Sequence, residues 1–239
     1  MLYSVMGITF LAGALQGFSG FGYSLLALPL LCVFVPARWA VPVISVSSLS
    51  LNVMVFITFR QNLNLKGFLP MAAAGVVFTP VGAWLLGHFS DSTVRVIIGA
   101  IVAGASALSL SRHLPTVKQT AFGMTAAGVL SGVFNGLTTF SGPPAVIYLS
   151  AVRAEKNSFR ANLSAFFIVL TIAAIPSFIG TGIASVPELL QAAVYIPGAA
   201  AGGITGILIS KKVDSSAYRK AVLVILSLLG VLGALQALV

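Results

Sequence analysis

The stretch Gly17-Phe-Ser-Gly-Phe-Gly-Tyr-Ser24 interrupts the apolar sequence near the start of the chain. A second interruption, Asn135-Gly-Leu-Thr-Thr-Phe-Ser-Gly-Pro-Pro144, lies in the other half of the chain. Glycine lets a backbone turn sharply, and proline suits a first helical turn. Both interruptions precede apolar segments, 22–36 and 143–152, that are too short to cross a membrane comfortably. The pattern predicts two helices that are broken inside a membrane.

The composition places the chain in a membrane. Of the 239 residues, 58% are hydrophobic and only 7% are charged, and the mean hydropathy is +1.07. A soluble domain carries about 25% charged residues, so soluble enzymes, secreted modules and disordered proteins are excluded. The net charge of +9 comes from residues between apolar runs, which indicates topology rather than binding to nucleic acid. No soluble domain is expected. The segment 96–111 is also short for a membrane crossing. The ten apolar segments are 2–18, 22–36, 39–59, 67–87, 96–111, 119–134, 143–152, 161–182, 189–210 and 221–239.

The two halves of the chain resemble each other. Gly13-Ala-Leu-Gln-Gly17 matches Gly128-Val-Leu-Ser-Gly132, 115 positions later. We therefore predict two repeats, residues 1–117 and 118–239, of five segments each. An odd number of segments inverts the second repeat. The predicted fold is an all-α polytopic membrane protein, with two inverted five-segment repeats whose broken or re-entrant helices meet near the membrane midplane.

The basic residues predict the orientation. With the loop after residue 210 in the cytoplasm, eleven of the thirteen Lys and Arg residues fall on the cytoplasmic side. Arg38 and Arg95 fall on the other side. Both termini are then non-cytoplasmic, in a multi-pass protein of the cell membrane.

The predicted membrane core contains no Asp, Glu, His, Lys or Arg. That argues against an enzyme, a metal site and an intramembrane carboxylate as proton carrier; we expect no cofactor. Helix N-termini at the interruptions suit an anion, because their first N–H groups lack partners and the dipole is positive there. The candidate substrate-binding residues are Gln16, Ser19, Gly20, Gly22, Tyr23, Ser24, Asn135, Gly136, Thr138, Thr139, Ser141, Gly142 and Pro143.

Three more polar residues are candidates for a pathway. Asn52 shares one helix face with Ser45 and Ser48, which suits either a pathway or hydrogen bonds between helices. Arg38 and Arg160 fall at equivalent places, at the mouths of the two hairpins that the segments on either side of each interruption would form. They suit the steering of anions and equally the anchoring of helices at the headgroups.

The two motifs resemble those of the TauE/SafE family, also called the toluene sulfonate uptake permease family. The first is Gly17-Phe-Ser-Gly-Phe-Gly-Tyr-Ser-Leu-Leu-Ala-Leu-Pro-Leu-Leu31, and the second runs from Gly132 to Leu149. The family's motif positions fall on Gly20, Gly22, Pro29, Gly136, Gly142, Pro143 and Pro144. Where many members have further glycines, this chain has Tyr23-Ser24.

The resemblance implies a secondary transporter in a bacterial inner membrane. Its substrate would be a small sulfur-containing anion such as sulfite, thiosulfate, a sulfonate or sulfoacetate, moved by alternating access. The coupling ion, proton or sodium, and a possible homo-oligomer stay open. The alternatives are a membrane scaffold or accessory subunit that transports nothing, and a passive anion channel.

Overall fold

The structure is a bundle of helices. The computed structural model describes residues 2–64, 68–110, 118–153 and 155–214; the predicted segment 221–239 lies outside them. Within these ranges every regular element is helical, and five helices are long and apolar enough to cross a membrane. The prediction of an all-α polytopic membrane protein is confirmed. The helices are α1 (Leu2–Ser19), α2 (Tyr23–Cys32), α3 (Ala37–Phe59), α4 (Leu69–His88), α5 (Asp91–Leu110), α6 (Ala121–Thr138), α7 (Gly142–Ala151), α8 (Lys156–Gly180), α9 (Val186–Gln191) and α10 (Ile196–Lys211), with short 3-10 turns at Arg60–Asn62 and Ala192–Tyr195.

The helices that follow the two interruptions are short, as predicted. α2 and α7 each have 10 residues, which is about 15 Å, or half of the hydrocarbon core. The prediction that segment 96–111 is short is wrong, because α5 has 20 residues and begins at Asp91. Its polar first turn lowers the hydropathy there. Asp91 is used structurally: it pairs with Arg95 at 2.8 Å and accepts a bond from the Ala37 amide at 2.6 Å.

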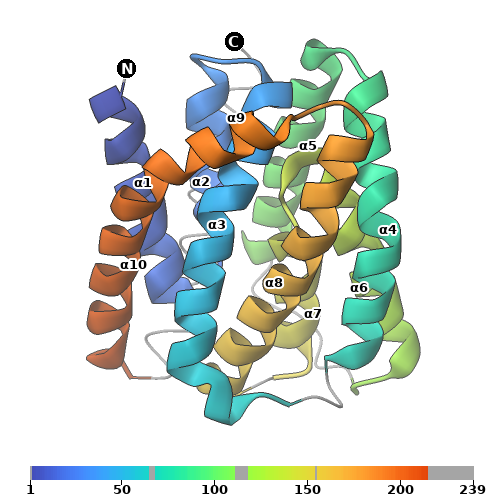
Figure 1. Ribbon diagram of the computed structural model, residues 1–239. Helices are drawn as coiled ribbons and strands as arrows, with labels where there is room; N and C mark the ends of the chain where they lie inside the picture. Colours follow the sequence, from blue (N-terminus) through green and yellow to red (C-terminus); the bar gives the residue numbers. More distant parts are fainter. Residues whose placement is uncertain (1, 65–67, 111–117, 154, 215–239) are drawn as a thin grey trace.

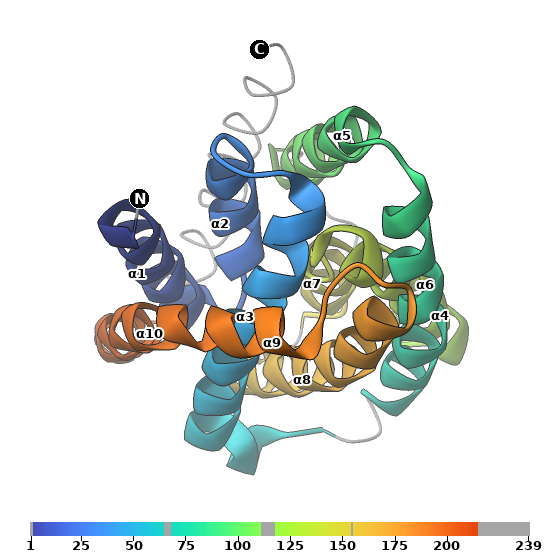
Figure 2. The ribbon, with the colours of Figure 1, turned by 45° about the horizontal axis from the view of Figure 1, so that its top comes forward.

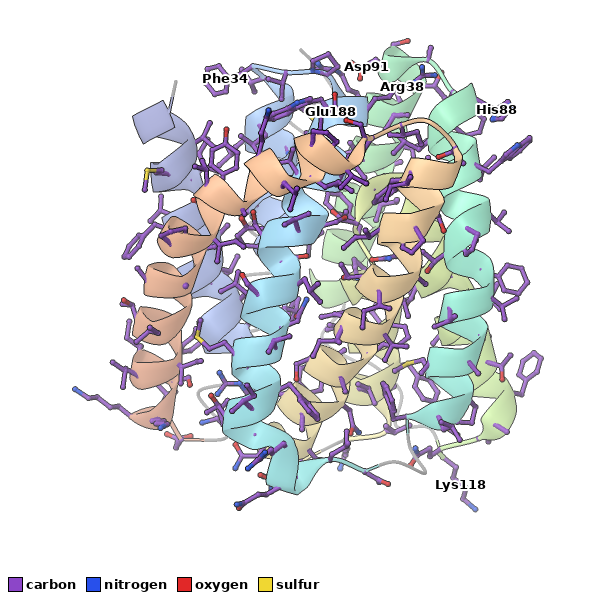
Figure 3. The ribbon with its side chains drawn as sticks, viewed as in Figure 1. Phe34, Arg38, His88, Asp91, Lys118 and Glu188 are labelled. Atoms are coloured by element: carbon purple, nitrogen blue, oxygen red, sulfur yellow. The ribbon has the colours of Figure 1, made fainter. Side chains whose placement is uncertain are left out.

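The two interrupted elements start from opposite ends of the bundle. Phe34, Arg38, His88, Asp91 and Glu188 lie at one end, which we call the His88 end, and Lys118 lies at the other, the Lys118 end (Figure 3). The chain descends from the His88 end through α1 and returns through α2 (Figure 1). α6 starts at the Lys118 end, and α7 returns there. The two breaks therefore lie inside the bundle.

Glycines bring α1 against α10. The two helices lie side by side in Figures 1 and 2 and form one of the largest helix contacts. A methyl carbon placed on Gly13 would lie 2.3 Å from the carbonyl oxygen of Ala199, and one on Gly17 would lie 2.1 Å from that of Gly203. Any side chain at these positions would overlap the backbone of α10. This close packing is typical of small residues between membrane helices.

Glycines bring α6 against α4 in the same way. A methyl carbon on Gly132 would lie 2.4 Å from the carbonyl oxygen of Gly75, and one on Gly136 would lie 2.1 Å from that of Thr79. Gly13 and Gly132 are 119 positions apart, and their partners Ala199 and Gly75 are 124 apart.

The helix contacts give their own spacing between the two halves. The breaks are also 119 positions apart, since α1 ends at Ser19 and α6 at Thr138. The sequence match at 115 positions differs from this spacing by four residues, about one helical turn, whereas the match of Gly82 with Gly206 has the offset of 124. The cause is that glycines recur every four residues at Gly128, Gly132 and Gly136, so the pattern matches itself after such a shift.

Candidate functional site

The first break is built from a hydroxyl and two glycines. The Ser19 hydroxyl lies 2.8 Å from the Leu15 carbonyl and accepts a bond from the Phe21 amide at 3.3 Å. Gly20 and Gly22 have φ of 87° and 101°, a left-handed region that favours glycine. This turn ends α1 and lets α2 begin at Tyr23 in a new direction.

The second break repeats this hydroxyl arrangement with different residues. The Thr138 hydroxyl donates to the Phe134 carbonyl at 2.9 Å and accepts from the Phe140 amide at 3.3 Å. Here Thr139, with φ of 59°, makes the left-handed turn. A β-branched residue in this conformation is strained. Strain retained at a helix break is typical of functional sites.

A small cavity of about 30 Å³ lies between the breaks. Its walls come from α1, α2 and α3 in the first half of the chain and from the second break, α7 and α8 in the second half. It brings together seven of the thirteen predicted substrate-binding residues and the pathway candidate Asn52. The lining residues are Gln16, Gly22, Tyr23, Ser24, Leu25, Ser48, Asn52, Thr139, Phe140, Ser141, Gly142, Phe167 and Thr171.

A hydrogen bond inside the cavity wall links α1 to α3. The Gln16 amide donates to Oδ1 of Asn52 at 2.5 Å, and both side chains are 2% exposed. With its oxygen occupied, Asn52 offers its amide N–H groups to a ligand. Asn52, which the sequence analysis places on a pathway, thus lies in the wall of the cavity.

Two helix N-termini face the cavity without a side-chain cap. Gly22 and Ser141 precede α2 and α7, and neither provides a capping hydrogen bond. α6 and α8 are capped, by Thr120 and Glu155. The lining contains no Asp, Glu, His, Lys or Arg. The cavity thus offers backbone N–H groups, amides and hydroxyls, which suit an anion.

Six predicted site residues do not line the cavity. Ser19 and Thr138 shape the breaks, as described above, and Gly136 packs against α4. Asn135 donates to the Leu170 carbonyl at 3.1 Å and so holds α6 to α8. Gly20 packs against Arg160, with 3.1 Å between its virtual methyl carbon and the Arg160 Cγ. Pro143 instead faces an open apolar depression of about 670 Å³ between α5, α6 and α7.

Five of the lining residues were not among the predicted substrate-binding residues or the pathway candidates Asn52, Arg38 and Arg160: Leu25, Ser48, Phe140, Phe167 and Thr171. Ser48 lies one helical turn before Asn52, and Thr171 occupies in α8 the place of Asn52 in α3, 119 positions later. The sequence already places Ser48 on the helix face of Asn52, and Thr171 in the polar counterpart of that face in the second half. Leu25, Phe140 and Phe167 carry no polar group, and only packing reveals them.

The two pathway arginines lie in different surroundings. Arg38 is exposed at the His88 end (Figure 3) and donates to the Gly87 and Phe89 carbonyls at 2.8 Å. It also lines a depression of about 240 Å³ together with Glu188. Arg160 is 1% exposed within α8. An offset of 119 pairs Arg160 with Val41, three residues from Arg38, so the predicted equivalence of the two arginines stays a prediction.

The chain matches the model of one protein family along nearly its whole length. The family model "Sulfite exporter TauE/SafE" matches residues 5–232. No curated protein and no solved structure matches the chain. The described residues contain no group of three or more His, Cys, Asp or Glu side chains placed to hold a metal ion. The family is one of membrane transporters, which agrees with the apolar helices described above. The chain belongs to the sulfite exporter TauE/SafE family.

Proposed function

We propose that this protein is a secondary transporter of small sulfur-containing oxyanions, with sulfite as the first candidate. It binds the anion in the cavity between the two helix breaks and moves it by alternating access. It carries the anion without chemical change. One observation carries the proposal: two uncapped helix N-termini, one from each half of the chain, face a cavity lined by neutral donors.

Neutral donors suit the transport of an anion. A helix N-terminus and a hydroxyl each stabilise negative charge without burying a cation. The side chains with donors left for an anion are Gln16, Asn52, Ser24 and Ser141. The Ser48, Thr139 and Thr171 hydroxyls donate to backbone carbonyls in this state and would have to turn toward a bound anion. Since no carboxylate lines the cavity, a driving proton would travel on the anion itself, or sodium would bind to backbone carbonyls.

The size of the cavity supports a closed state. A water needs roughly 10–15 Å³ of such volume, and the cavity has about 30 Å³. A sulfur oxyanion is larger than the few waters this admits, so it enters only when the breaks move apart. Movement of this kind is part of alternating access.

The inverted repeat and the orientation are parts of the same proposal. The offsets of 119 and 124 in the helix contacts support two related halves, and α1 and α6 start from opposite ends (Figure 1). Helix ends that carry Lys156, Lys211 and Lys212 lie at the Lys118 end. That end is therefore the cytoplasmic one, in a multi-pass protein of a bacterial inner membrane.

Ligand-dependent thermal stabilisation of the purified protein tests the proposal. The panel is sulfite, sulfate, thiosulfate, sulfoacetate, an aromatic sulfonate, acetate and chloride at one ionic strength. An anion at about 100 times its dissociation constant adds roughly 2.7 kcal/mol to stability. We expect sulfite or a near relative to stabilise the wild type and to lose this effect in Ser24→Ala and Thr139→Ala. Ser50→Ala is the matched control, because the Ser50 hydroxyl bonds the Ser47 carbonyl outside the cavity. Stabilisation by no anion, or equal stabilisation of all three variants, contradicts the proposal.

A further inference from the structure

Arg160 is the largest fully buried side chain of the described residues. It lies four residues after the start of α8, about 6 Å along the helix. A guanidinium buried in a membrane span is costly, and such residues usually mark an ion pathway. The role of this cation therefore requires an explanation beyond anchoring at the headgroups.

The contacts of Arg160 join three helices at the first break. Nη1 donates to the Ser210 hydroxyl on α10 at 2.8 Å, and Nη2 donates to the Gly17 carbonyl in the last turn of α1. Cζ lies 4.0 Å from the centre of the Phe59 ring at the end of α3. The last turn of a helix carries partial negative charge, so the guanidinium stabilises the broken end of α1.

Arg160 lies between the cavity and the Lys118 end. The residues of α8 that line the cavity are Phe167 and Thr171, seven and eleven residues further along the helix, or about 10 and 16 Å. α8 runs from the Lys118 end to the His88 end (Figure 1). An anion that leaves the cavity toward the Lys118 end along α8 therefore meets Arg160.

The equivalent place at the other end is apolar. The offsets of 119 and 124 match Arg160 with Val41, Phe59 with Phe178, and Ser210 with Leu86. Val41, Phe178 and Leu86 are each 0% exposed and belong to one apolar cluster. Charged and polar contacts of Arg160 therefore join the helices near the Lys118 end, whereas apolar contacts of Val41 join the corresponding helices near the His88 end.

We propose that Arg160 is a second, transient anion-binding residue and forms the gate at the Lys118 end. This inference rests on the proposed transport function. The departing anion replaces the Gly17 carbonyl and the Ser210 hydroxyl on the guanidinium. The present acceptors are neutral, whereas an anion adds the attraction between two opposite charges to the hydrogen bonds of the guanidinium, so the exchange is favourable. It breaks the contacts of Arg160 with α1 and α10 and opens this end only, while Lys156 still holds α8 to the Ser210 and Val213 carbonyls. The apolar contact of Val41, Phe178 and Leu86 at the other end opens without an anion partner.

Cysteine labelling tests the gate without any ligand. The background is Cys32→Ser, which removes the chain's one cysteine, and the reporter is Ser24→Cys in the cavity. An impermeant anionic thiosulfonate is added to vesicles of either orientation. His88→Cys and Lys118→Cys, at opposite ends in Figure 3, show which end each preparation exposes. We expect Arg160→Gln to speed labelling at least tenfold from the Lys118 end and less than twofold from the His88 end.

Two further variants keep the labelling test decisive. Ser210→Ala removes one partner but keeps the cation, so it should speed labelling from the Lys118 end several-fold, even if Arg160→Gln does not fold. Arg38→Gln, at the His88 end, is the matched control and should leave labelling from the Lys118 end unchanged. Labelling that does not change, or that rises equally from both ends, overturns the gate.

Sulfite counterflow in proteoliposomes tests the anion exchange. The affinity of the cavity for sulfite, measured in detergent, should stay within threefold of wild type in Arg160→Gln, while counterflow falls at least tenfold. Unchanged counterflow, or a fall that only follows a loss of affinity, overturns the role of Arg160 in anion binding. If the wild type itself shows no sulfite counterflow, the proposed function fails, and the labelling result still decides the gate.

Discussion

The Gln16 side chain on α1 donates a hydrogen bond to the Asn52 side chain on α3 at 2.5 Å, beside the first helix break. The pair fixes the orientation of the Asn52 amide, because the acceptor oxygen faces Gln16. The donor N–H groups of Asn52 are then available to the cavity. We expect this arrangement to favour an anionic ligand and to be disturbed by a negative charge in the cavity wall.

Asn52→Asp should abolish binding of sulfite. The substitution keeps the shape of the side chain and an acceptor for Gln16 but removes the donors and adds a negative charge. Two charges about 4 Å apart repel by about 4 kcal/mol near a protein surface, so affinity should fall more than a hundredfold by calorimetry. Asn62→Asp is the control, because Asn62 is exposed after α3. A variant Asn52→Asp that binds sulfite like wild type would remove Asn52 from the site.

Thr139→Gly should raise stability and weaken sulfite binding together. The residue has φ of 59°, a conformation that costs a β-branched side chain about 1 kcal/mol or more and glycine almost nothing. The same change removes a hydroxyl from the cavity wall. The melting temperature should rise by a few degrees while the dissociation constant for sulfite increases.

Thr181→Gly is the matched control for this pair of effects. Thr181 follows α8 with φ of −89°, so glycine has no strain to relieve there. Its melting temperature should stay level or fall. A fall in stability for Thr139→Gly as well would show that the turn is not strained.

Gly136→Ala should destabilise the protein strongly. Its methyl group would lie 2.1 Å from the Thr79 carbonyl oxygen and 2.4 Å from the Ala83 amide nitrogen, so α4 and α6 would have to move apart. Overpacking typically costs 1–3 kcal/mol, which predicts a melting temperature lower by several degrees. Gly104→Ala, where a methyl group would meet nothing within 4 Å, should leave it unchanged or slightly higher, because alanine favours a helix more than glycine does. Equal melting temperatures for the two variants would contradict the close contact.

The orientation of the bundle can be measured in whole cells. Lys118→Cys in the Cys32→Ser background should resist an impermeant thiol reagent added outside, and His88→Cys should react, because the basic residues predict that the Lys118 end is cytoplasmic. After the cell envelope has been permeabilised, both cysteine variants should react with the reagent. Labelling of Lys118→Cys in intact cells would reverse the proposed topology.

Much of the fold could be predicted from sequence because a membrane leaves few choices. Backbone groups in lipid must bond within a helix, so apolar runs become helices and the glycine-rich stretches become breaks. The start of α5 was missed because hydropathy ignores a polar first turn that Asp91 and Arg95 stabilise. The sequence match at 115 positions differs from the contact spacing by one helical turn. Glycines that recur every four residues match equally well after a shift of four residues, so they do not determine the alignment.

The sequence predicts the region around the cavity more closely than the individual side chains that line the cavity. All polar residues around each break were candidates, but neighbouring residues of a helix point to different sides of it, so only some of them reach the cavity. Gln16 faces the cavity, whereas Gly136 packs on α4 and Asn135 bonds the Leu170 carbonyl. Arg160 was placed at a headgroup interface, since nothing in a linear sequence shows that α1 and α10 enclose it.

Sulfite counterflow into proteoliposomes tests the central claim most directly. Vesicles loaded with unlabelled sulfite and diluted into radioactive sulfite should accumulate label transiently, and vesicles with Asn52→Asp should not. The wild type should reach turnover rates typical of a carrier, saturate with sulfite and be inhibited by thiosulfate or a sulfonate more than by acetate. Wild-type vesicles that accumulate no label, or a flux that does not saturate, would contradict a transporter that binds sulfur oxyanions between the two breaks.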